Sequence, residues 1–151
     1  MPVNSEAMLN QQSSEVKKFI RAAAVHREGA EVLLKSCPER GRSVLAHEVI
    51  YLSGYVVECA LKALLLNCFP KAKHPEKVEW LKAELKHYLE KLKHELSKKG
   101  VELPDEQKEN LKRVRSPWSP EMRYQTRLWS TEEAKRVFVA AEGIFDWVNR
   151  G

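Results

Sequence analysis

Basic and aromatic side chains alternate in the second half of the chain, a mixture that is typical of surfaces that bind nucleic acids. Five basic residues border three aromatic residues there: Lys112, Arg113, Arg115, Arg123 and Arg127 around Trp118, Tyr124 and Trp129. Cations in such a stretch can follow a phosphate backbone while aromatic rings stack on bases. The alternative interpretation is a solvated basic face beside a loop that its aromatic residues anchor.

A lysine-rich segment in the middle of the chain carries most of the excess positive charge. The net charge is +5, and residues 71–100 contain nine lysines against five glutamates. Lys82, Lys86 and Lys93 fall on one face of a predicted helix. We therefore expect a nucleic-acid-binding set that joins these lysines to the second cluster: Lys82, Lys86, Lys93, Arg115, Arg123 and Arg127.

Glu58 and Lys62 stand inside an otherwise apolar stretch, residues 56–66. Their spacing and order favour an ion pair along a helix. A structural ion pair is one interpretation, and a polar site that orients a ligand is the other.

Several classes of site are not supported by the sequence. It contains no glycine-rich phosphate loop, no G-x-S-x-G elbow and no H-E-x-x-H pair. The three cysteines, Cys37, Cys59 and Cys68, have no C-x-x-C spacing. His87 and His94 would lie about 10.5 Å apart along a helix, too far to share one metal ion. We therefore expect no metal site and no cofactor.

The apolar residues recur at helical spacing along most of the chain, and prolines and glycines end each run. The length predicts a flexible N-terminal segment, 1–13, followed by one domain, 14–150. The pattern predicts an all-α, antiparallel up-and-down bundle of four main helices plus a short extra helix. The main helices are expected at about 14–37, 45–67, 75–99 and 131–149, and the short one at 105–115. A capping box, Ser130 to Glu133, begins the last helix.

The second predicted helix resembles the signature helix of HEPN domains in the stretch SGYVVECALKALL, residues 53–65. Three shorter stretches extend the resemblance over most of residues 16–149: AEVLL at 30–34, LKHYL at 85–89 and MRY at 122–124. The resemblance implies a helical bundle that usually dimerises and acts on or binds RNA or nucleotides. We place Tyr124, from the closing stretch, with Glu58 and Lys62 as a further candidate polar site.

Active HEPN domains are metal-independent endoribonucleases that carry the motif R-x4-6-H. In them the arginine stabilises the phosphate, and the histidine helps to deprotonate the 2'-hydroxyl. Arg42 and His47 have this spacing and are our candidate catalytic pair. The family's motif usually lies late in the chain, whereas this pair lies early. The leading hypothesis is therefore binding without strong intrinsic catalysis.

Three functions stay open at this stage. The first is a domain that binds RNA, a nucleotide or a protein partner. The second is a metal-independent endoribonuclease of a toxin-antitoxin or defence system, and the third is a purely structural dimerisation module. The resemblance implies a homodimer and a nucleotidyltransferase-like partner. No secretory signal or unbroken apolar span is evident, so we expect a cytoplasmic protein without membrane contact.

Overall fold

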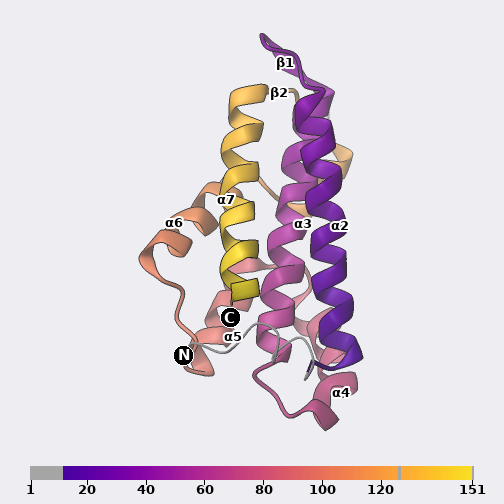
Figure 1. Ribbon diagram of the computed structural model, residues 1–151, viewed down its shortest axis with the longest axis vertical. Coiled ribbons are helices and arrows are strands. Elements are labelled where there is room, and N and C mark those ends of the chain that lie inside the picture. The colour runs from indigo at the N-terminus through magenta and orange to yellow at the C-terminus, as the bar shows by residue number, and fades with distance from the viewer. Residues whose placement is uncertain (1–11, 126, 151) are drawn as a thin grey trace.

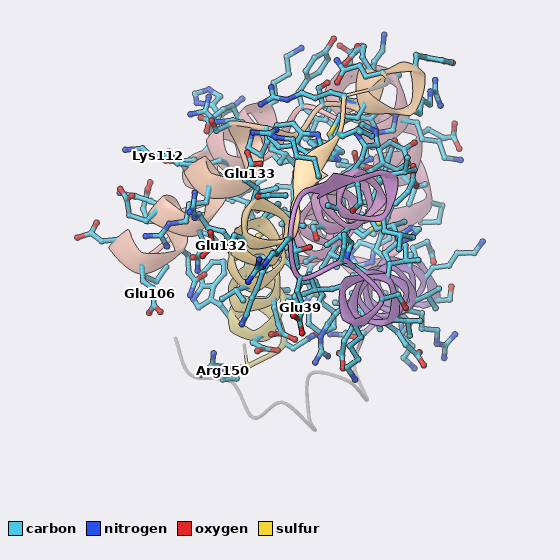
Figure 2. The ribbon with its side chains drawn as sticks, turned by 90° about the horizontal axis from the view of Figure 1, so that it is seen from above. Glu39, Glu106, Lys112, Glu132, Glu133 and Arg150 are labelled. Carbon is cyan, nitrogen blue, oxygen red and sulfur yellow. The ribbon has the colours of Figure 1, made fainter. Side chains whose placement is uncertain are left out.

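The computed structural model describes residues 12–125 and 127–150 and shows a helical bundle (Figure 1). Three long helices run side by side: α2 (Ser14–Lys35), α3 (Val44–Leu66) and α7 (Thr131–Arg150). Three shorter helices complete the bundle: α4 (His74–Trp80), α5 (Leu89–Lys98) and α6 (Asp105–Arg115). The view from above shows Lys112 of α6 and Glu133 of α7 on the same side of the molecule (Figure 2). The all-α prediction is confirmed.

The central helix is α3, which packs against α2, α5, α6 and α7. It has the length and apolar composition of a helix that could cross a membrane, but 78% of its most apolar 18-residue window is buried inside the bundle. This burial is the pattern of a core helix. Ile50 and Val56 of this helix are covered by neighbouring helices, so they offer no surface for the expected dimer contact.

Serine side chains cap the three long helices. Ser13 Oγ accepts a hydrogen bond from Val16 N at 3.2 Å, and Ser43 Oγ accepts one from Ala46 N at 3.1 Å. At α7, Ser130 Oγ accepts from Glu133 N at 3.1 Å, while Glu133 Oε1 accepts from Ser130 N at 3.0 Å. Each cap satisfies a backbone donor that the helix leaves free. The predicted capping box is confirmed.

The prediction of one continuous third helix over 75–99 is wrong. After α4 the chain forms a π-helical turn, η2 (Leu81–Leu85), and then breaks at Lys86 before α5 begins at Leu89. Lys86 has a φ of 45°, where a residue with a Cβ is strained. Because the helix is interrupted there, Lys82, Lys86 and Lys93 do not share one continuous helix face. The bundle therefore has three long helices, with shorter ones in place of the fourth.

The connection between α6 and α7 is ordered in the described residues 116–125 and 127–130. It contains a 3-10 helix, η3 (Pro120–Tyr124). It ends in the two-residue strand β2 (Trp129–Ser130), which pairs antiparallel with β1 (Arg42–Ser43). The sequence predicted no strands. The pairing arises because the chain is extended just before a helix begins, and the starts of α3 and α7 lie together at one end of the bundle.

Candidate functional site

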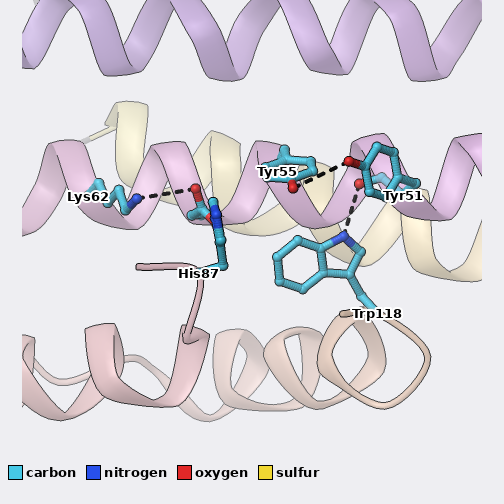
Figure 3. Close-up of polar contacts among 6 residues, drawn as sticks. Tyr51, Tyr55, Lys62, His87 and Trp118 are labelled. Carbon is cyan, nitrogen blue, oxygen red and sulfur yellow. Dashed lines mark hydrogen bonds and ion pairs between the residues drawn. The ribbon is translucent and has the colours of Figure 1, made fainter. Parts of the chain in front are cut away.

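A buried carboxylate on α3 holds two basic side chains from different parts of the chain (Figure 3). Glu58 Oε2 accepts a hydrogen bond from Lys62 Nζ at 3.2 Å, and Glu58 Oε1 accepts one from His87 Nδ1 at 2.7 Å. The side chain of Glu58 is only 6% exposed, whereas that of His87 is 46% exposed. An unpaired charge at such depth would be costly, so both partners stabilise the carboxylate. The histidine therefore connects the interior to the surface.

The break in the third predicted helix brings His87 to this position. The π-helical turn ends at Leu85, and the strained Lys86 redirects the backbone before Leu89 starts α5. In a continuous helix, the direction of the His87 side chain would be set by the rotation of about 100° per residue. Strained residues and π-helical turns are frequent at functional sites. They persist only where contacts with the surrounding structure hold them in place. The hydrogen bond from His87 to Glu58 is one contact that does so.

An aromatic cluster lies beside His87. The Tyr55 ring makes edge contacts with Tyr51, Trp118 and His87, with ring centroids 5.1, 5.4 and 5.8 Å apart. Trp118 Nε1 donates to the backbone oxygen of Tyr51 at 2.9 Å (Figure 3). Burial, with the hydrogen bond to Tyr51, raises the pKa of Tyr55 above its ordinary value. The phenol therefore stays neutral within the aromatic cluster.

Gly54 makes the position of Trp118 possible. A Cβ at this glycine would lie 2.0 Å from Trp118 Cε2 and Nε1, far inside any real contact distance. Only a residue without a side chain allows the indole to lie this close to α3. The loop that follows α6 is therefore seated on α3 by a glycine and an indole.

A groove of about 460 Å³ opens over these residues. We call it the His87 groove; its lining includes His87, Tyr88 and Trp118 and three cations: Lys86, Arg115 and Arg123. Glu58 and Lys62 do not line the groove; His87, which binds Glu58, does. The structure thus brings together half of the predicted nucleic-acid-binding set.

The other predicted binding residues do not line the His87 groove. Lys82 is exposed and pairs with Glu79 at 3.6 Å. The Arg127 guanidinium lies over the Trp129 ring at 3.9 Å. Tyr124 lies under the Arg123 guanidinium at 4.8 Å. It is exposed, whereas Glu58 and Lys62 are buried. Lys93 is partly buried on α5.

Arg42 and His47 are each held by a different backbone carbonyl. Arg42 Nη1 donates to the oxygen of Leu128 at 3.2 Å and lies 3.6 Å from Glu133 Oε1. His47 is only 5% exposed, and its Nε2 donates to the oxygen of Met122 at 2.8 Å. In the described residues His47 thus joins η3 to α3. The catalytic role of this pair stays a prediction.

The sequence predicts no site role for His87, which appears there only in the LKHYL stretch and in the excluded metal pair with His94. The available signal was Glu58, a carboxylate in an apolar run that needs partners for two oxygens. Lys62 satisfies one of them, so a second donor was to be expected. Within the described ranges, no three potential metal-ligating side chains gather at one point.

Comparison with known proteins identifies the family. No curated protein and no solved structure matches the chain. The family model of the HEPN domain matches residues 16–151, which is nearly the whole chain. The chain therefore belongs to the HEPN domain family.

Proposed function

We propose that this HEPN domain binds RNA or a nucleotide in the His87 groove. The observation that carries the proposal is that Lys86, Arg115 and Arg123 line one groove together with aromatic side chains. Cations supply the attraction to phosphate, and exposed rings supply stacking for bases. Tyr88 is 54% exposed and offers such a ring, whereas the largely buried Trp118 forms a wall.

Two carboxylates, Glu90 and Glu121, line the groove beside its three cations. Glu90 pairs with Arg115 at 3.1 Å, and both side chains are about half exposed. An ion pair this exposed contributes roughly 0–1 kcal/mol. A phosphate, which offers more acceptor oxygens and charge, can therefore replace Glu90 as the partner of Arg115.

The test is the salt dependence of RNA binding. Fluorescence anisotropy with a labelled 12-nucleotide RNA in EDTA would compare the wild type with Arg115→Gln/Arg123→Gln. Two lost phosphate contacts should lower the slope of log affinity against log salt by about 1.4, since each contributes about 0.7 on a single strand. A matched control, Lys35→Gln/Lys98→Gln, removes the same charge at residues that do not line the groove. Equal slopes in the two variants, or no binding by the wild type, would reject the proposal.

A second candidate function is metal-independent RNA cleavage, and a different observation favours it. The Glu58 carboxylate orients the His87 imidazole through Nδ1, which leaves Nε2 free to exchange a proton with a ligand in the groove. Chelator-resistant cleavage that His87→Ala abolishes would support this function. Cleavage that only His47→Ala or Arg42→Ala abolishes would instead support the pair predicted from the sequence.

We also propose a cytoplasmic protein, and a homodimer that pairs with a nucleotidyltransferase-like protein as the family resemblance implies. Support for a self-contact comes from α2, where Val25 and Val32 are 65% and 60% exposed. They border a shallow apolar hollow with Gly29 and Leu52. Light scattering should give about twice 17.4 kDa for the wild type. Val25→Lys/Val32→Lys should give the monomer mass, and a monomeric wild type at high concentration would contradict the dimer.

A further inference from the structure

A second basic hollow, of about 350 Å³, lies between the end of α6 and the start of α7. We call it the α6–α7 pocket. Three cations and one carboxylate line it: Lys112, Arg113, Arg136 and Glu133. Figure 2 shows Lys112 of α6 and Glu133 of α7 on the same side of the molecule. The pocket also lies at the N-terminal end of a long helix, where the helix dipole favours anions.

The carboxylate of Glu133 already has partners. It accepts a hydrogen bond from Ser130 N at 3.0 Å and lies 3.6 Å from Arg42 Nη1. The hydrogen bond from the Ser130 backbone lowers the pKa of Glu133, and Arg42 and Arg127 add to the effect. Glu133 is therefore occupied by the capping box and by arginines outside the lining of the pocket. Positive charge is left in excess at the pocket itself.

The cations of the pocket are available to a ligand. Lys112 pairs with Glu109 at 3.5 Å with both side chains more than half exposed, so this pair is weak. Arg113 donates to Asn110 Oδ1 at a long 3.4 Å. Arg136 makes no ion pair within the described part of the chain.

Trp129 adds an independent observation at the same pocket. The residue lines the pocket and is 7% exposed, and its Nε1 has no hydrogen-bond partner among the described residues. A buried donor without an acceptor destabilises the folded chain. A bound oxyanion is the type of acceptor that such a donor lacks. Donors and cations in excess over acceptors fit a phosphate group.

The α6–α7 pocket and the His87 groove lie on two sides of one chain segment. Lys112, Arg113 and Pro117 line the pocket, whereas Arg115 and Trp118 line the groove. The end of α6 and the turn that follows it thus form the ridge between the two. An α-helix with its side chains is roughly 10–12 Å across. A ligand that fills both hollows must cross about that distance, which is more than one phosphate group can span.

We infer that the α6–α7 pocket is a second phosphate site for the ligand of the His87 groove, so that the ligand is a single-stranded oligonucleotide rather than a mononucleotide. This inference rests on the proposed function, because the groove supplies the first site. Lys112, Arg113 and Arg136 would bind a second phosphate of the same ligand, on the other side of the end of α6 from the His87 groove.

The test compares two ligands, a nucleoside monophosphate and a 12-nucleotide RNA, at several salt concentrations. The pocket variant is Lys112→Gln/Arg136→Gln, the groove variant is Arg115→Gln/Arg123→Gln, and the control is Lys35→Gln/Lys98→Gln. We expect the pocket variant to lower the salt slope for the 12-mer by about 1.4 and to leave mononucleotide affinity unchanged. The groove variant should weaken the binding of both ligands.

The outcomes separate the two claims. If the pocket variant keeps the wild-type slope for the 12-mer while the groove variant loses it, the second site is wrong and the proposed function stands. If the groove variant binds both ligands like the wild type, the proposed function fails and this inference fails with it. If the pocket variant loses affinity for the mononucleotide as much as for the 12-mer, the pocket cations act only through the overall positive charge. That result would reject the second site.

Discussion

Replacing Gly54 with alanine should dislodge Trp118 from α3 and weaken the whole bundle. The new Cβ would lie 2.0 Å from the indole, so the ring must leave its place. A buried tryptophan covers about 150–250 Å² of surface, which corresponds to roughly 4–6 kcal/mol at about 25 cal/mol per Å². The lost Trp118–Tyr51 hydrogen bond adds about 1 kcal/mol, and the helix propensity of alanine returns about 1 kcal/mol. Partial relaxation reduces the sum, so we expect a loss of about 3–5 kcal/mol.

Gly29 on α2 provides the matched control. Its nearest neighbour to an added Cβ is Leu52 Cδ1 at 3.6 Å, an ordinary contact distance. The same substitution there should stabilise the fold by about 0.5–1 kcal/mol, because alanine favours the helix. Urea unfolding followed by circular dichroism measures both free energies. If Gly54→Ala is as stable as Gly29→Ala, the close contact between Trp118 and α3 does not exist. The position of Trp118 in the lining of the His87 groove would then be refuted.

Four further predictions concern the caps, the core and the strained backbone. Ser130→Ala should cost about 1 kcal/mol. The hydrogen bond from the Ser130 backbone lowers the pKa of Glu133, so the ionised carboxylate stabilises the fold at pH values above the ordinary carboxyl pKa. This stabilisation is lost as the pH falls. The urea midpoints of the wild type and Glu133→Gln should therefore converge between about pH 6 and pH 3. Burial raises the pKa of Cys59 to about 11, so mass spectrometry should find it unalkylated by iodoacetamide at about pH 8 until denaturant is added. Lys86→Gly should raise the unfolding free energy by roughly 0.5–1 kcal/mol, since glycine accepts a positive φ, and a decrease would mean that Lys86 is not strained.

Local signals predicted most of the helices. The apolar spacing and the Ser130–Glu133 pair marked α7, and the amphipathic pattern with Leu111 and Val114 marked α6 at Asp105–Arg115. Both signals act within one helix, through its own repeat and its free backbone groups. They do not depend on the rest of the fold, so a single sequence is enough to find them.

The break before α5 could not be predicted in this way. The apolar stripe of Leu81, Leu85, Tyr88 and Leu92 continues across it, so helical periodicity gives no warning. The contact recorded at the break is tertiary: His87 bonds to Glu58, which lies 29 positions earlier in the chain. The close approach of Trp118 to Gly54 has the same origin. The predicted cations were therefore identified by type, and only the fold showed which of them share a groove.

The most direct test of the central claim is an NMR titration of the histidine side chains with the 12-nucleotide RNA in EDTA. His87 lines the proposed groove, whereas His94 lies on α5 and lines a different hollow. The account predicts that the His87 ring signals shift and saturate with added RNA while the His94 signals stay in place. RNA that leaves the His87 signals unchanged, or that shifts both rings equally, would contradict binding in the His87 groove.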